Sequence, residues 1–289
     1  MKSLSIIIPH FNSKDSLIVL LNSIPNNDWI QTIVIDDNSN FNIFELAENY
    51  KHIEIFKVDK NKKGAGAARN LGLEKATGNY LLFADSDDYF TENAFEIVKN
   101  KINKSFDIIY FAPISIHIKS GKPATRHLST ILLIEDYIKN KNKEIFFKNY
   151  GPVSKLISTK LITDYSIKFE EILTSDDVMF SLMVAYYSEK IEVSKEVIYV
   201  ITESDNSLTK QKSEKHEDCR FQTMVRYNDF LVSKGLEKFQ GSMFPHLRNA
   251  KKFGWYKFWY ILFYCKHNNY PIFYDYKHFS RILKRNFTT

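Results

Sequence analysis

Short apolar runs and amphipathic segments alternate along the first part of the chain. Continuous apolar runs, typical of strands buried on both faces of a parallel sheet, lie at residues 4–8, 32–35, 53–58, 80–84 and 106–111. Helices are predicted to begin at Ser13, near residues 43–49, at Gly64 and at Thr91. Pro9 is expected to close the first strand, and Gly78 to stop the helix over 64–77. This alternation predicts an α/β sandwich with a mostly parallel central sheet.

Polar residues follow three of the apolar runs directly. Asn12 comes after the first run, Asp36 and Asp37 after the second, and the acidic segment 85–88 after the fourth. In open parallel sheets, ligands bind at the carboxyl ends of the strands. We therefore expect these side chains to gather at one edge of the sheet and to form an active site there.

The acidic segment 85–88 reads Asp-Ser-Asp-Asp, with three carboxylates in four residues. Such groups repel one another, and a bound divalent cation removes that cost; oxygen ligands suit Mg²⁺ or Mn²⁺. An isolated motif of this kind is more often a solvated turn. Here a strand precedes it and a helix is predicted after it, which favours a metal site at Asp85 and Asp87. Magnesium completes its coordination with substrate phosphates, so a nucleotide diphosphate is the expected ligand.

The glycine-rich segment 64–68 does not match a dinucleotide-binding fingerprint. Arg69 stands where that fingerprint needs Gly or Ala, and a polar loop precedes the segment in place of a strand. It also lacks the Gly-Lys-Ser/Thr of a P-loop. Two interpretations stay open: the helix start with Lys62, Lys63 and Arg69 favours phosphate, or the glycines allow tight packing of the helix on the sheet.

Composition indicates an ordinary globular protein of 289 residues, with 44% hydrophobic and 26% charged residues. The two cysteines, Cys219 and Cys265, are far apart and offer neither a disulfide framework nor metal-ligand spacing. No apolar run of about 18 residues predicts a membrane span. Residues 4–9 are too short for the apolar core of a signal peptide. A cytoplasmic location is expected, and the alternative is peripheral attachment at the inner face of the cell membrane.

The C-terminal segment 239–289 differs in composition from the rest of the chain. It holds nine Lys or Arg residues, one acid and sixteen aromatic residues. Its net charge is therefore +8, whereas the rest of the chain carries −2, which together give the net charge of +6. We interpret 1–210 as a catalytic domain and 211–289 as a helical appendage. Three alternatives are open for the appendage: it rests on an anionic membrane, it contacts a partner subunit such as a second copy of the chain, or it packs on the catalytic domain.

Four motifs in a fixed order resemble the family 2 glycosyltransferases of the GT-A fold. They read SIIIPHFN at 5–12, IVIDDNS at 33–39, GAGAARN at 64–70 and FADSDD at 83–88. VSKLI at 153–157 and TSDDVMF at 174–180 add to the resemblance, the latter looking like the family's acidic box with Asp176 in place of Glu. The resemblance runs from about residue 4 to 209 and implies a nucleotide-binding half over 1–112 and an acceptor-binding half over 113–210.

The resemblance also implies roles for individual residues. Asp177 would be the catalytic base, Asp87 and Asp85 would hold Mn²⁺ or Mg²⁺, and Asp37 with Asp36 would recognise the base of a UDP-sugar donor. The other donor-binding residues implied are Pro9, His10, Phe11, Asn12, Lys63, Gly64, Arg69 and Ser86. Asp176 and Lys155 would contact the acceptor, which is expected to be a saccharide or a lipid-linked saccharide of a bacterial surface polysaccharide.

A single displacement that inverts the anomeric carbon is the expected mechanism, because no nucleophilic Ser, Cys or His arrangement accompanies the motifs. Two alternatives differ in class. A non-catalytic sugar-nucleotide-binding component of a polysaccharide assembly would predict loss of Asp87 or Asp177, and both are present. A nucleic-acid-binding role for the basic aromatic tail lacks any accompanying fold signature, so no nucleic-acid partner is expected.

Overall fold

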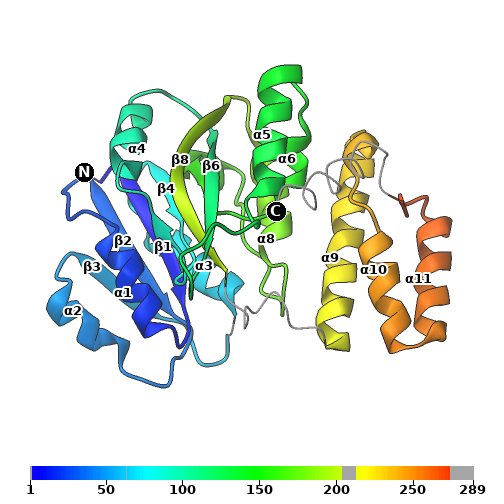
Figure 1. The fold of residues 1–289 in the computed structure, drawn as a ribbon, viewed down its shortest axis with the longest axis horizontal. Helices are drawn as coiled ribbons and strands as arrows, with labels where there is room; N and C mark the ends of the chain where they lie inside the picture. Colours follow the sequence, from blue (N-terminus) through cyan, green and yellow to red (C-terminus); the bar gives the residue numbers. More distant parts are fainter. Residues whose placement is uncertain (1, 63, 204–212, 274–289) are drawn as a thin grey trace.

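The structure, a computed structural model, describes residues 2–62, 64–203 and 213–273 (Figure 1). Its strands are β1 (Leu4–His10), β2 (Ile30–Asp36), β3 (Ile53–Lys57), β4 (Tyr80–Phe83), β5 (Tyr89–Phe90), β6 (Ile108–His117), β7 (Lys155–Ser158) and β8 (Ile191–Glu203). Its α-helices are α1 (Lys14–Asn22), α2 (Leu46–Asn49), α3 (Ala65–Lys75), α4 (Ala94–Ile102), α5 (Leu128–Asn140), α6 (Glu144–Lys148), α7 (Thr159–Asp164), α8 (Asp177–Tyr187), α9 (Glu214–Ser233), α10 (Phe244–Ala250) and α11 (Trp255–His267). The 3₁₀ turns are η1 (Ile43–Glu45), η3 (Glu237–Phe239) and η4 (Lys251–Phe253).

One eight-stranded sheet carries the fold, in the order β3-β2-β1-β4-β7-β6-β8-β5. The first four of these strands are parallel neighbours, and β6 pairs parallel with β8. Strands β7 and β5 run the other way. The sheet is therefore mixed but mostly parallel, which confirms the predicted α/β fold class, and the carboxyl ends of β1, β2 and β4 lie side by side.

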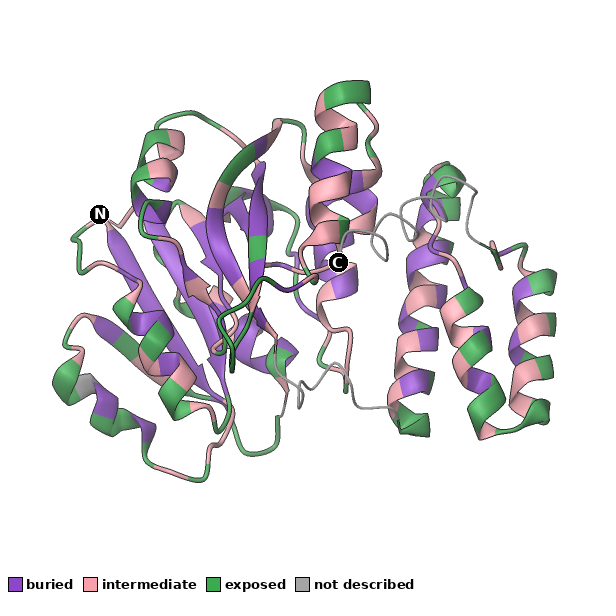
Figure 2. Cartoon of the chain, in the orientation of Figure 1, coloured by how far each residue is buried: buried purple, intermediate pink, exposed green. Residues whose placement is uncertain are grey.

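Alternate residues of the central strands feed two cores, one on each face of the sheet. Ile6 and Ile8 of β1 face a core covered by α1, α2 and α4. Ile7, between them, faces the other core, to which α3, α5, α6, α7 and α8 contribute. Figure 2 shows the strands as the most continuously buried part of the chain. A sheet buried on both faces explains why its strands read as unbroken apolar runs.

Three predicted element ends were wrong. Pro9 lies within β1, which continues to His10. Helix α3 ends at Lys75, and a Cβ on Gly78 would come within 2.5 Å of the Ser5 backbone nitrogen, so Gly78 serves close packing on β1. Thr91 does not cap α4, which begins at Ala94; its hydroxyl donates to the Val197 carbonyl oxygen at 2.9 Å.

The C-terminal part forms a helical unit, α9–α11, as predicted for the appendage (Figure 1). Helix α9 belongs to two cores. Tyr227 and Leu231 pack in the core that contains Ile7 and lies between the sheet and α3, α5, α6, α7 and α8, whereas Phe221 and Val225 pack with α10 and α11. The proposed domain boundary after residue 210 lies outside the described residues. Among the described helices, none combines the length and hydropathy that a bilayer crossing requires.

Candidate active site

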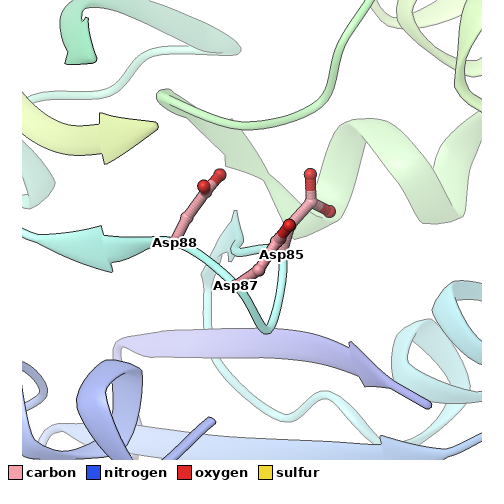
Figure 3. Close-up of side chains that lie close together, drawn as sticks. All are labelled: Asp85, Asp87 and Asp88. Carbon is pink, nitrogen blue, oxygen red and sulfur yellow. The ribbon is translucent and has the colours of Figure 1, made fainter. Parts of the chain in front are cut away.

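The loop after β4 gathers three carboxylates (Figure 3). One oxygen each from Asp85, Asp87 and Asp88 lies within 4.8 Å of the others. Asp88 is buried and accepts a hydrogen bond from the Thr202 backbone nitrogen at 2.7 Å. Three oxygen ligands on one short loop fit the donor set of Mg²⁺ or Mn²⁺. The sequence predicted Asp85 and Asp87 for this role, and the structure brings Asp88 to the same place.

The electrostatics of this loop favour a cation. Burial, and then the neighbouring carboxylates of Asp85 and Asp87, raise the pKa of Asp88 well above its ordinary value. Desolvation and the Asp85 carboxylate also raise the pKa of Asp87, although its side chain is exposed at the protein surface, and Arg126 acts in the opposite direction. Groups that resist ionisation together gain most from a positive charge placed between them.

Arg69 connects the acidic loop to the second acidic motif. Its guanidinium donates to Asp85 Oδ1 at 2.7 Å and to Asp176 Oδ2 at 2.6 Å, and it lies over the ring of Phe169. Arg69 is 6% exposed. Burial lowers its pKa, but the two carboxylates outweigh that effect and hold the pKa above its usual value. The sequence assigned Arg69 to the donor; the structure places it as a buried link between the two acidic motifs.

Asp177 begins α8, and its carboxylate faces the loop at Gly151. A Cβ built on Gly151 would lie 4.0 Å from Asp177 Oδ2. Burial, and then the adjacent Asp176, raise the pKa of Asp177 to about 6, while Arg69 opposes this shift. A carboxylate with a pKa near neutrality can accept a proton and release it again, as a general base requires. Neither Ser175 nor Thr174 caps the helix; Asp176 precedes it.

Lys155 is not available to an acceptor, and the prediction that it binds one was wrong. The side chain is 2% exposed, and its ammonium donates to the Asn149 carbonyl oxygen at 2.7 Å and to Ser181 Oγ at 3.4 Å. Burial lowers its pKa to about 7, against the opposing charge of Asp177. Ser181 Oγ in turn donates to the Tyr150 carbonyl oxygen at 2.6 Å. Lys155 and Ser181 thus fasten the loop that lies against Asp177.

The loops after β1 and β2 are joined through His10 and Asp36. The Nδ1 of His10 lies 3.3 Å from Asp36 Oδ1, while its Nε2 accepts from the Ser13 backbone nitrogen at 3.2 Å. Because Nε2 accepts this hydrogen bond, the ring proton lies on Nδ1, which donates to Asp36. Burial lowers the pKa of His10 despite the raising effect of Asp36. Asp36 is fully buried and also pairs with Lys57 at 3.5 Å. Direct contact between Asp36 and a nucleotide base is therefore excluded, which corrects that expectation.

Asp37, the next residue, points elsewhere. Its Oδ2 accepts from the Gly64 backbone nitrogen at 2.8 Å, and Gly64 has a φ of +99°, which favours glycine. A Cβ on Gly66 would meet the Glu170 carbonyl oxygen at 2.1 Å, so this glycine serves tight packing. The packing interpretation of the glycine-rich segment thus holds for Gly66. Phosphate binding at this helix start stays a prediction.

The remaining predicted donor residues surround the same edge. Phe11 is 54% exposed, and Asn12, with a φ of +51°, accepts from the Asn40 backbone nitrogen at 2.8 Å. Ser86 Oγ lies 2.8 Å from Ser13 Oγ, which ties the acidic loop to the start of α1. Pro9 lies within β1 and is buried. Lys63 lies outside the described residues.

Comparison with known proteins agrees with this arrangement. The model of glycosyl transferase family 2 matches residues 5–165. Staphylococcus aureus TarS, a poly(ribitol-phosphate) beta-N-acetylglucosaminyltransferase, is 26% identical over 207 residues, which are 69% of this chain and 35% of TarS. TarP of the same species, which carries the same activity name, is 30% identical over 227 residues, 74% of this chain and 68% of TarP. The chain thus spans about a third of the length of TarS.

Two further similarities concern an enzyme and a fold. A Campylobacter jejuni enzyme named GalNAc(5)-diNAcBac-PP-undecaprenol beta-1,3-glucosyltransferase is 30% identical over 116 residues, 38% of each chain. The crystal structure of S. aureus TarS residues 1–349 in complex with UDP-GlcNAc matches with a TM-score of 0.66 at 23% identity, covering 80% of this chain and 67% of that one. This likeness shows that the two chains share a fold.

Proposed function

Because the chain belongs to glycosyl transferase family 2 and has the GT-A fold, we propose that it is an inverting, metal-dependent glycosyltransferase. The donor would be a sugar on a nucleotide diphosphate, with UDP as the nucleotide. The acceptor would be a hydroxyl of a saccharide or of a lipid-linked saccharide in surface polysaccharide synthesis. TarS and TarP, which act on poly(ribitol phosphate), and the undecaprenol-linked acceptor of the C. jejuni enzyme support that acceptor class by their names.

One observation carries the proposal: Arg69 forms hydrogen bonds to both acidic motifs and so fixes their relative position. It bonds Asp85 in one loop and Asp176 in the other, and Asp177 follows Asp176 directly. A divalent cation held by Asp87 and Asp85, with Asp88 beside them, would neutralise the charge that develops on the leaving diphosphate. Glycosyl transfer needs a base for the acceptor hydroxyl and a site that binds the leaving diphosphate. Arg69 would hold the two groups that serve these needs in a fixed relative position.

Each protein group then has a separate task in the displacement. The Asp177 carboxylate would take the proton of the acceptor hydroxyl as its oxygen attacks the anomeric carbon. The bond from that carbon to the phosphate oxygen breaks, and its electron pair leaves with UDP. Attack opposite to the leaving group inverts the anomeric carbon. Asp37, Phe11 and Asn12 would line the nucleotide, and His10 with Asp36 would hold their loops in position.

An assay of nucleoside diphosphate release, which detects both UDP and GDP, tests this proposal. We would incubate the protein with UDP-GlcNAc, UDP-glucose, UDP-GalNAc and GDP-mannose, and measure donor hydrolysis with and without Mn²⁺. We expect one UDP-sugar to be cleaved, with a loss of about 10²-fold or more in EDTA that Mn²⁺ or Mg²⁺ restores. The same turnover in EDTA would contradict the metal role. Absence of donor binding in calorimetry with metal present would contradict the function itself.

The pH dependence of transfer reports on Asp177. Its raised pKa of about 6 means that the base is ionised above that pH and becomes protonated below it. We expect kcat/KM, which reports on the free enzyme, to be level between about pH 7 and 8 and to fall about tenfold per pH unit well below pH 6. Donor binding measured over the same range separates this effect from protonation at the acidic loop. A profile that stays level down to about pH 5 would exclude Asp177 as the base.

A further inference from the structure

Helix α11 presents a row of aromatic side chains to solvent. This aromatic face consists of Trp255 (59% exposed), Tyr256 (87%), Trp259 (48%), Tyr260 (50%) and Phe263 (62%). In Figure 2 the helix lies at the outer end of the helical unit, away from the sheet. Single exposed aromatic residues are ordinary, but five on one face of a 13-residue helix form a contiguous patch. Such a patch marks an interaction surface.

The opposite side of α11 fixes this orientation. Ile261 and Cys265 are buried, at 3% and 0% exposure, in a core shared with Phe221 of α9 and with Met243 and Leu247. Lys257, also on that side, pairs with Glu214 at 2.9 Å and Asp218 at 2.5 Å. The helix is therefore held by the packing of its inner face, and the aromatic face on the opposite side points to solvent.

Charge is segregated in the same unit. Residues 244–273 contain five Lys or Arg residues and no Asp or Glu. Each acid of α9 has a partner: besides Glu214 and Asp218, which pair with Lys257, Glu217 pairs with Arg220, and Asp229 accepts from the Tyr270 hydroxyl. The exposed lysines Lys251 and Lys252 precede the aromatic face, and exposed Lys266 follows its last member. The outer surface is thus aromatic along its length and basic at both ends.

We propose that the aromatic face of α11 lies on an anionic membrane surface, with the helix parallel to the bilayer plane. Trp and Tyr favour the boundary between acyl chains and headgroups, and flanking lysines attract anionic lipids. The aromatic face runs from Trp255 to Phe263, which is about 12 Å along the helix axis. Residues 274–289, which continue the chain beyond the described residues, add four basic residues and one acid to the same end of the chain.

A second copy of the chain fits this surface less well than lipid. A symmetric pair through the aromatic face would bring Lys251, Lys252 and Lys266 of both copies into one interface. No acid in 244–273 is available to balance them. Like charges in an interface oppose association, whereas an anionic leaflet attracts all of them. The proposal goes beyond transfer chemistry and does not depend on it.

The test is co-sedimentation of the full chain with vesicles. Phosphatidylcholine vesicles with and without phosphatidylglycerol distinguish charge from simple apolar adsorption. We expect binding to the anionic vesicles only, release by high salt, and a blue shift of tryptophan fluorescence. In a Trp29→Phe background, both remaining tryptophans belong to the aromatic face, so the shift reports on that face alone.

Point variants identify the surface without disturbing the core that a truncation after residue 239 would expose. Trp255→Ser with Trp259→Ser should abolish binding, and Phe44→Ser, an equally exposed aromatic site outside the helical unit, should leave it unchanged. Replacing Lys251, Lys252 and Lys266 by Ala should weaken binding about 10²-fold, because each basic residue near an anionic leaflet contributes roughly a fivefold factor.

Three results would overturn the proposal. One is no binding to anionic vesicles at low salt. Another is binding by the Trp255→Ser, Trp259→Ser variant that equals that of the unmodified chain. The last is a dimer in solution that this variant converts to a monomer, since the face would then join two copies. UDP release by the same variant should be unchanged, so failure here is distinguishable from failure of the transferase proposal.

Discussion

Replacing Asp87 by alanine is expected to abolish sugar transfer and to weaken metal-dependent binding of UDP. Asp87 is the exposed member of the acidic loop, and its carboxylate is free of the Arg69 contact that occupies Asp85. It is therefore the group best placed to hold a cation against a diphosphate. Loss of such charge stabilisation lowers kcat by about 10²–10³-fold or more. UDP release and calorimetry with UDP, each with and without Mn²⁺, measure the two effects.

A matched control for this variant is Asp28→Ala. Asp28 is an exposed aspartate in the connection between α1 and β2, away from the acidic loop in sequence. It should leave turnover and UDP binding unchanged. Normal metal-dependent turnover in the Asp87→Ala protein, with its thermal stability preserved, would show that Asp87 is not the metal ligand. Rescue of the wild-type rate by excess metal would instead indicate a weakened site.

Replacing Asp177 by asparagine is expected to lower kcat by roughly 10²–10⁴-fold while donor affinity stays close to normal. Asparagine keeps the shape of the side chain at the start of α8 but cannot take the acceptor proton. Burial raises the pKa of Asp177 to about 6, which favours the proposed role as a base. Single-turnover kinetics with a saturating acceptor, together with donor calorimetry, measure the two quantities separately.

Asp176→Asn serves as the neighbouring control. It removes the same charge one residue away and takes from Arg69 one of its two carboxylate partners, at 2.6 Å. A charge left partly unpaired inside the protein lowers stability, so this variant should reduce the melting temperature more than Asp177→Asn does. Should Asp177→Asn lose donor binding and keep its rate at saturation, Asp177 would be part of the donor site and not the base.

The α/β fold class could be predicted from the sequence, because strands that are buried on both faces of a sheet appear in the sequence as continuous apolar runs. The sequence was also sufficient to bring Asp37, Asp85 and Asp87 to one edge, since that edge follows from strand direction alone. The residues that follow each strand in its loop can be read directly from the sequence. Element ends were less certain: Pro9 stays inside β1 because its neighbours Ile8 and His10 still pair with Val34 and Asp36 of β2.

Side-chain direction is the part that the sequence could not supply. Asp36 and Asp37 are adjacent, yet one is fully buried against His10 and the other bonds Gly64. Arg69 finds its partners 16 and 107 residues away. Lys155 is buried, contrary to the usual behaviour of lysine, because Asn149 and Ser181 supply oxygen acceptors that only the folded chain brings together.

Helix α9 also limits how this chain can be recombined. Its Tyr227 and Leu231 pack in the sheet core that contains Ile7, while Phe221 and Val225 pack in the core of the helical unit. A chimaera that exchanges the C-terminal helices of two such chains must therefore keep α9 with its own sheet. The incoming α10 and α11 must then be matched to the outer side of α9.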